Sequence, residues 1–514
     1  MTAEGTPQKV IARGVGSNAF SFIIRFAARA SFLYIGARLY GAAAYGVFSL
    51  AVAVVELMVP VASLGLKRMI FPWLEEEANA GTGTGTGIGT GAGTGAADAR
   101  PATHVLLDAL LLTALSGLGI AGVVALGAQV LPAAMVSDQL RFALAVLAPA
   151  VLGQAAGDVA LAATRWTHMM RYEVMARGVI EPYVATAVTF AAWYAGFTET
   201  GLLFGYWAGS LALAGTALWS ARHSLGPLRI ARWRPHVGAL TRRTRSLLPA
   251  SGSDLLTSLA QRIDLYLVGF LLGDAPAGVY GVLRQLRTPI TQVRQSFDGI
   301  LTPLIARTMR AAGDIVTGEA TAAATRLILT IQLAIVLLMA AAGEPLLALF
   351  GPHYVVGYHA LIAMALAETV NGAFGVGELI LYYRRPALAL LINVVLIAIA
   401  AILVPALAPL FGILGASAAM LFAAIVATLL RRHWLKQLGV QQPPLHAAAP
   451  VVGLLAGGAA GLLLYEVLAD VFRAPARIEA IATPLLALAV YGLTIRLWTK
   501  LRPGVLSMAR FRVL

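Results

Sequence analysis

The chain has 514 residues, of which 59% are apolar and only 12% charged, and its mean hydropathy is +0.80. Soluble proteins carry about 25% charged residues and could not bury this much apolar surface, so the composition favours a polytopic membrane protein. The chain has no cysteine, which excludes disulfides and thiolate chemistry. The N-terminus lacks the residue order of a cleaved signal peptide, so we expect the first span to be retained.

Runs of roughly 20 apolar residues predict an all-α membrane protein with about fourteen transmembrane helices. The predicted centres lie near residues 28, 56, 116, 152, 187, 210, 260, 290, 335, 368, 396, 422, 458 and 487. Spans one to six form a predicted N-lobe over residues 1–222. A flexible linker rich in glycine and threonine, at residues 78–103, separates the second span from the third.

A basic cytoplasmic connector is predicted at residues 223–247, and seven arginines lie between Arg222 and Arg245. Spans seven to twelve form a predicted C-lobe over residues 248–436. Spans thirteen and fourteen, with a basic cytoplasmic tail, occupy residues 437–514. The expected architecture is therefore two six-helix lobes followed by two further helices.

The basic residues divide unequally between the two sides of this topology. With the N-terminus inside, 28 of the 38 lysines and arginines fall on the cytoplasmic side and six lie within spans. Four fall on the outer side: Arg38, Arg141, Arg473 and Arg477. This bias predicts that both termini are cytoplasmic. Topology thus accounts for the formal net charge of +14, and we expect no nucleic-acid partner.

An internal repeat relates the starts of the two lobes. Residues 29–50 and 262–282 both place an arginine seven residues before a glycine, and both continue through a short turn into Tyr-Gly-Val. Both copies start from the same side of the membrane, so the lobes are predicted to be parallel repeats. Two repeated six-helix lobes are typical of a transporter that works by alternating access.

Six arginines lie within predicted spans, where each costs about 2.5–3.5 kcal/mol at a helix centre. They are Arg25, Arg29, Arg262, Arg284, Arg287 and Arg294. At this cost they must face water, a partner or a ligand. The simplest arrangement is one cationic cavity lined by spans one, seven and eight. Because the planar guanidinium offers paired donors that suit phosphate, this cavity predicts an anionic substrate.

Polar residues share the faces of these arginines: Asn18, Ser21, Asp254, Ser258, Gln261, Asp264, Thr291 and Asp298. Internal ion pairs are equally open for two of the arginines. Arg262 could pair with Asp254 or Asp264, and Arg294 with Asp298. Arg284 could instead reach the outer interface of the membrane.

Acidic residues within spans are candidates for coupling to a proton or sodium gradient: Glu368, Glu378 and Asp158. A single acid of this kind is more often a hydrogen-bonding partner in helix packing. The histidines show no metal-ligand spacing, and we expect no metal and no cofactor.

Two stretches carry a family resemblance. GARLYGAAAYGVFSLAVAVVELMVPVASLGLKRMI at residues 36–70 and FGILGASAA at residues 411–419 resemble bacterial polysaccharide flippases of the O-antigen type. These belong to the multidrug, oligosaccharidyl-lipid and polysaccharide exporter superfamily and are related to the lipid II flippase. The resemblance covers roughly residues 11–436 and implies a V-shaped pair of lobes. It also implies that Arg25, Arg29, Arg284 and Arg287 occupy places comparable to those of arginines that bind pyrophosphate.

The resemblance implies a flippase that moves an undecaprenyl-diphosphate-linked oligosaccharide from the inner to the outer leaflet of the bacterial cytoplasmic membrane. Its expected partners are this lipid-linked substrate, membrane lipids and polysaccharide assembly proteins, and we expect a monomer. A lipid II flippase and a multidrug exporter are alternatives, although an exporter of cationic drugs would favour an acidic cavity. A membrane polymerase or ligase would need a sizeable outer loop, so we expect a transporter rather than an enzyme.

Overall fold

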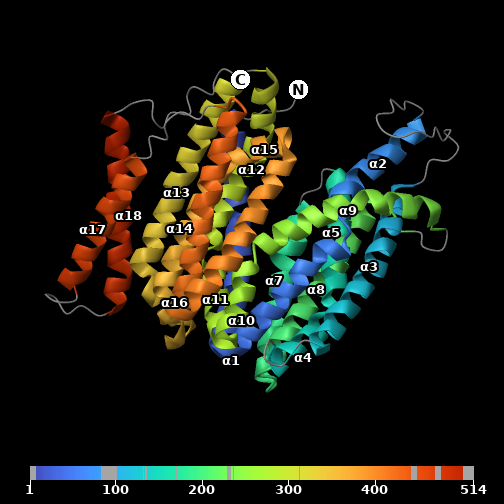
Figure 1. Cartoon of the computed structure of the whole chain (residues 1–514), viewed down its shortest axis with the longest axis horizontal. Helices are drawn as coiled ribbons and strands as arrows, with labels where there is room; N and C mark the ends of the chain where they lie inside the picture. The colour runs from blue at the N-terminus through green and yellow to red at the C-terminus, as the bar shows by residue number, and fades with distance from the viewer. Residues whose placement is uncertain are drawn as a thin grey trace. The chain divides into compact units, whose positions relative to one another are not determined.

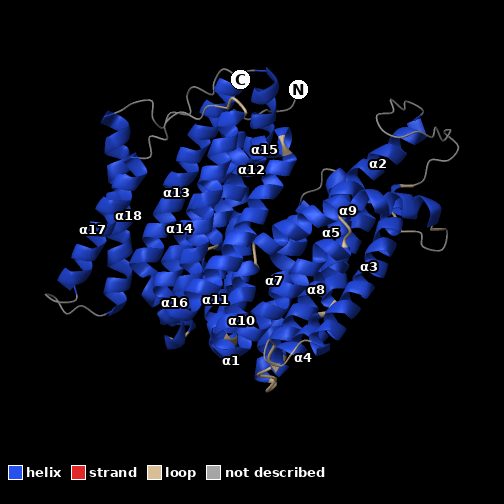
Figure 2. Ribbon diagram, viewed as in Figure 1, coloured by secondary structure: helices blue, strands red, loops and turns tan. Residues whose placement is uncertain are grey.

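A computed structural model of the chain shows an all-helical protein, and the residues that it describes contain no strand (Figure 2). The described residues are 7–82, 101–130, 132, 136–167, 171–228, 233–235, 237–311, 313–440, 448–468 and 476–501. They divide into two compact units, residues 1–262 and residues 263–514. The division lies within the predicted seventh span rather than before it, because α9 packs against α1 of the first unit.

The helices of the first unit follow one another in the order seen in Figure 1. They are α1 Pro7–Ala62, α2 Leu66–Thr82, α3 Ala102–Val130, α4 Asp138–Leu147, α5 Ala150–Trp166, α6 Arg171–Met175, the π-helical turn η2 Ala176–Ile180, α7 Glu181–Tyr194, α8 Gly201–Leu225 and α9 Val237–Ala260.

The second unit continues with the remaining helices (Figure 1). They are α10 Ile263–Leu272, α11 Asp274–Leu286, α12 Thr288–Ala311, α13 Gly313–Phe350, the 3-10 helix η4 Pro352–Gly357, α14 Tyr358–Phe374, the 3-10 helix η5 Gly375–Gly377, α15 Glu378–Arg384, α16 Pro386–Gln437, α17 Ala448–Glu466 and α18 Ala476–Leu501.

In the described part of the chain, eight helices are long and apolar enough to cross a membrane, or up to ten if each of two bent pairs is one span. Two of the eight, Ala27–Ala78 and Pro386–Gln437, have 52 residues each. At 1.5 Å per residue each would measure about 78 Å, more than twice a hydrocarbon core of about 30 Å, so each must cross twice. Every centre predicted from the sequence lies within a helix, and the multi-pass helical fold is confirmed.

Glycines in the left-handed conformation make the turns in both copies of the repeat. Gly41 (φ 82°, ψ 172°) breaks α1 before Tyr45, and Gly273 (φ 89°, ψ −175°) separates α10 from α11 before Tyr280. A Cβ at either glycine would meet nothing within 4 Å, so the backbone conformation alone demands glycine there. Both tyrosines are buried, which agrees with the repeated sequence.

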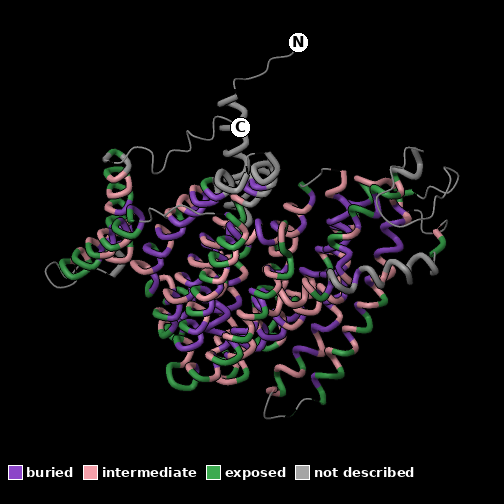
Figure 3. The backbone as a smooth tube through the Cα atoms, turned by 45° about the horizontal axis from the view of Figure 1, so that its top comes forward, coloured by how far each residue is buried: buried purple, intermediate pink, exposed green. Residues whose placement is uncertain are grey.

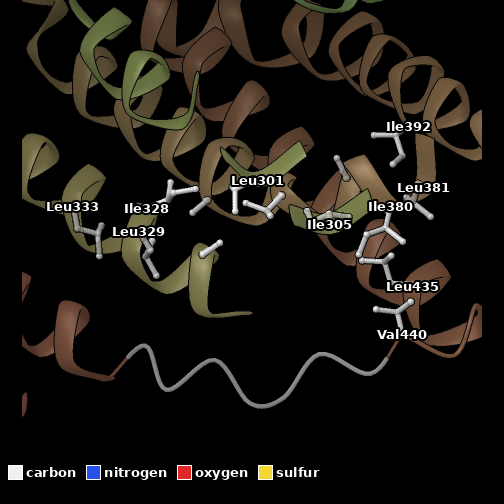
Figure 4. Close-up of a cluster of buried hydrophobic side chains, with 14 of the residues drawn as sticks. Leu301, Ile305, Ile328, Leu329, Leu333, Ile380, Leu381, Ile392, Leu435 and Val440 are labelled. Atoms are coloured by element: carbon white, nitrogen blue, oxygen red, sulfur yellow. The ribbon is translucent and has the colours of Figure 1, made fainter. Parts of the chain in front are cut away.

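Each unit has its own apolar core. In the first unit, leucines of α2, α3, α5 and α8 pack together, among them Leu66, Leu106, Leu161 and Leu213. The core of the second unit joins residues of α12, α13, α15 and α16, as Figure 4 shows for ten labelled side chains. Figure 3 shows buried residues alternating with exposed ones along the helices, as expected where helices pack on one side and meet lipid on the other.

Candidate functional site

The side chain of Arg29 lies on α1 and is exposed. About twelve residues separate it from the turn at Gly41, or about 18 Å of helix, so Arg29 lies near the middle of a span about 30 Å long. Among the described residues, no hydrogen bond or ion pair neutralises its guanidinium. A cation at this depth is expensive, and it therefore favours a negatively charged partner.

The other arginine of the repeat, Arg262, is held within the first unit. Its Nε and Nη2 donate to Glu56 Oε2 at 3.2 and 2.7 Å, and its Nη1 donates to the carbonyl oxygen of Ser258 at 3.4 Å. Asp254, one of the partners expected from the sequence, instead pairs with Arg68 at 2.5 Å. The ion pair of Arg262 therefore exists, but its acid comes from another helix.

In the second unit, Arg284 pairs with Asp264. Asp264 is only 2% exposed, and its second oxygen accepts a hydrogen bond of 3.0 Å from the hydroxyl of Tyr280. Neither the expected pairing of Asp264 with Arg262 nor a free position of Arg284 at the interface is observed. A buried carboxylate attracts the nearest guanidinium, since leaving it unpaired would cost several kcal/mol, about 3–5.

Two further arginines follow along α11 and α12. Arg287 pairs with Glu368 at 3.1 Å, and Thr291 donates to the same carboxylate at 2.9 Å. Arg294 donates to the carbonyl oxygen of Gly372 at 3.2 Å, near the C-terminal end of α14. A basic group at this end of a helix is favourable because it faces carbonyl groups that lack helical partners.

A buried arginine that the sequence did not single out lies in α16. Arg431 is 3% exposed, and its Nη2 contacts Glu378 at 3.0 Å and Asn371 Oδ1 at 2.9 Å. Because Arg432 follows it near the end of a span, the pair looks like an ordinary cytoplasmic boundary. Its burial could only be found by knowing that α14 packs against α16.

The acids of the first unit fall into two classes. Asp158 contacts both Lys67, at 3.7 Å, and Arg177. Glu181, which the sequence did not single out, instead accepts a hydrogen bond of 2.7 Å from the amide of Gln154. The same amide donates to Ser210 at 3.1 Å, so three separate helices meet at this carboxyl group.

The remaining predicted residues are quickly placed. Gln261 is exposed next to Arg262. The side chains of Asn18, Ser21, Arg25 and Asp298 lie outside the described residues. The structure therefore associates Arg262, Arg284 and Arg287 with carboxylates, and it leaves Arg29 as the span arginine that presents an exposed guanidinium.

Comparison with known families places the chain. The profile of a family described as "Polysaccharide biosynthesis protein" matches residues 101–359, half of the chain. The chain belongs to the polysaccharide biosynthesis protein family. No protein of curated function matches this family member.

Solved structures share the fold of this polysaccharide biosynthesis family member. The lipid II flippase MurJ, in an inward closed conformation, matches with a TM-score of 0.72 and 11% identity over 94% of this chain and 99% of its own. An inward-facing multidrug resistance MATE transporter of the MOP superfamily gives 0.60 and 15% over 82% and 99%. The Vibrio cholerae MATE transporter VcmN gives 0.52 and 15% over 86% and 99%. At these identities the likeness concerns the fold alone.

Proposed function

We propose that this protein flips an undecaprenyl-diphosphate-linked oligosaccharide from the inner to the outer leaflet of the bacterial cytoplasmic membrane. Membership of the polysaccharide biosynthesis family supports a glycan substrate, and the fold shared with a lipid flippase and with MATE transporters supports movement across the bilayer. Both termini are cytoplasmic in this proposal, in agreement with the distribution of lysine and arginine.

The observation that carries the proposal is the exposed guanidinium of Arg29 near the middle of a span. An isolated arginine there costs about 2.5–3.5 kcal/mol, which a ligand of opposite charge offsets. A diphosphate supplies that charge together with oxygens arranged for paired hydrogen bonds. In this proposal Arg25, one helical turn earlier, binds the same diphosphate.

The isoprenoid tail remains in the lipid while the headgroup crosses, so only the sugar and the diphosphate need a polar route. Transport then requires that the site be exposed alternately to the two sides of the membrane, and that the substrate bind differently in the two states. Arg262, Arg284, Arg287 and Arg294 have partners in the structure, and in this proposal they join the diphosphate only by exchanging them.

Binding of undecaprenyl diphosphate to the purified protein in nanodiscs tests the role of Arg29. The Arg29→Ala variant should bind about 10- to 100-fold more weakly, because a hydrogen-bonded charge contact of about 1.5–3 kcal/mol is lost. Arg38→Ala is the matched control, since Arg38 is exposed on the same helix close to the turn. Wild-type affinity in Arg29→Ala would disprove the diphosphate site, and equal losses in both variants would reduce it to a general charge effect.

Transport itself is measured in proteoliposomes with a fluorescent lipid-linked oligosaccharide and an impermeant quencher. Wild type and Arg38→Ala should expose the label to the quencher faster than Arg29→Ala does. Equal rates with and without protein would contradict the proposal.

Lipid II is a second candidate substrate, because MurJ, whose printed name is lipid II flippase, matches nearly the whole chain at the highest of the three TM-scores given above. Lipid II also carries a polyprenyl diphosphate, so Arg29 serves both candidates equally. The same proteoliposomes, loaded in parallel with lipid II and with an oligosaccharide lacking the peptide, separate them by rate.

A further inference from the structure

Glu181 is an acidic residue in a membrane-spanning region whose hydrogen bonds come from neutral groups. It begins α7, and its Oε1 accepts from the Gln154 amide of α5, which also donates to Ser210 of α8. Gln154 and Ser210 are 7% and 1% exposed, so these contacts are dry. No ion pair among the described residues involves Glu181.

Close helix packing fixes the position of this carboxyl group. A Cβ at Gly209 of α8 would lie only 3.1 Å from the backbone oxygen of Glu181, so α8 approaches α7 through a residue without a side chain. The π-helical turn η2 immediately precedes Glu181, and Pro182 follows it. The carboxyl group is thus held at a rigid junction of three helices.

Four charged or titratable side chains act on Glu181 from the elements packed around it. Arg177 of η2 is paired with Asp158, and Glu56 of α1 is paired with Arg262. Tyr206 of α8 lies within the same electrostatic neighbourhood, and its buried hydroxyl has no hydrogen-bond partner in the described part of the chain. The fourth is Arg29, the residue assigned above to the diphosphate.

The acids expected from the sequence to couple transport are held differently. Asp158 contacts two cations, Glu368 contacts Arg287, and Glu378 contacts Arg431. A proton on any of them would leave a buried cation without its counter-charge, which is costly. A proton on Glu181 leaves its amide contact with Gln154 intact and removes a charge that neutral donors only partly stabilise.

We propose that Glu181 is a proton-binding site linked to occupancy of the diphosphate site at Arg29. The inference rests on the proposed function. In the empty state the Glu181 carboxylate is a negative charge that acts on the Arg29 guanidinium. Arrival of a diphosphate brings further negative charge, which favours uptake of one proton by Glu181 from the solvent. Release of the diphosphate favours return of that proton to the solvent.

Linkage makes this effect reciprocal: if the substrate promotes protonation, protonation must promote substrate binding by the same factor. Substrate is then held more tightly on the acidic side of a membrane and less tightly where protons are scarce. Couplings of this kind amount to about 5- to 150-fold in affinity. A proton gradient could therefore bias the direction of transport without any covalent step.

The first test observes the proton directly and needs no substrate. Infrared difference spectra of the protein in lipid, titrated between about pH 5 and pH 8, report the C=O stretch of a protonated carboxyl group. We expect a titrating band that is absent in Glu181→Gln and retained in Glu199→Gln, an exposed acid of the same unit. A spectrum in which Glu181→Gln removes no such band overturns the inference, whether or not the diphosphate binds.

The second test measures the linkage with undecaprenyl diphosphate as the probe. Wild type and Glu199→Gln should lose affinity by up to about tenfold per pH unit above the titration of Glu181, and Glu181→Gln should lose less. Protons taken up by the probe itself contribute equally to all three proteins, so the difference reports the carboxyl group. Identical pH profiles would overturn the linkage. Loss of binding at every pH together with a titrating infrared band would disprove the diphosphate site and leave Glu181 as a proton site.

Discussion

Arg284 and Asp264 form an ion pair across α11 and α10, and the Tyr280 hydroxyl donates to the carboxylate oxygen that the arginine leaves free. The pair lies directly after the Tyr-Gly-Val copy in the second unit. In the first unit the corresponding stretch has Ser31 two residues after its arginine, so the two copies of the repeat differ in charge where they agree in backbone.

Removal of one partner of this pair should destabilise the second unit. Arg284→Ala leaves a nearly inaccessible carboxylate uncompensated, at a cost of about 3–5 kcal/mol. The double variant Arg284→Gln with Asp264→Asn should recover most of the loss, because no charge remains. Thermal unfolding of the detergent-solubilised protein gives the comparison, and a double variant no more stable than Arg284→Ala would contradict this account.

Replacement of Arg29 by lysine should restore only part of the diphosphate affinity. Lysine keeps the charge but loses the planar pair of donors that suits a diphosphate. Arg29→Lys should therefore bind undecaprenyl diphosphate with an affinity between those of the wild type and Arg29→Ala. Full recovery would show that Arg29 contributes charge alone.

The turn at Gly273 should tolerate no side chain. Gly273→Ala should cost about 1–2 kcal/mol of stability, because L-residues disfavour a positive φ, although a methyl group would meet nothing within 4 Å. Gly122→Ala in α3 is the control, since a Cβ there also meets open space, within a regular helix. It should be neutral or stabilising by about 0.5–1 kcal/mol. Equal melting temperatures for the two variants would count against the conformational explanation.

A disulfide can test the packing of the last two helices. A Cβ at Gly461 of α17 would lie 3.2 Å from Cβ of Ala487 in α18, close to the separation of about 3.5–4.5 Å found in disulfides. The chain contains no cysteine, so Gly461→Cys with Ala487→Cys should cross-link under mild oxidation without background. Gly458→Cys with Ala487→Cys should not, because a Cβ at Gly458 meets only Leu337.

The sequence predicted the helices well, because length and hydropathy are local properties that a lipid environment enforces. It did not predict the partners of the arginines. Arg284, Arg287 and Arg294 were placed on one face of a single helix, but α11 ends at Leu286 and α12 begins at Thr288, so the register changes between them. Their partners come from α10 and α14.

Glu181 shows why such sites escape a reading of one sequence. It stands before a proline at the start of a helix, where an acid is unremarkable because it complements the helix dipole. Its significance comes from Gln154 and Ser210, which belong to two other helices. No local pattern connects residues so far apart along the chain, whereas packing of α5, α7 and α8 brings them into contact.

The glycine turns at Gly41 and Gly273 bear on how such proteins diverge. A reversal that depends only on an unhindered backbone leaves the flanking apolar residues free to change among one another over evolutionary time. Architecture can then outlast nearly all resemblance in letters, as the 11% identity to MurJ over almost the full length illustrates. Lineages built this way are free to acquire new cargo by changing a few charged side chains while the scaffold is inherited intact.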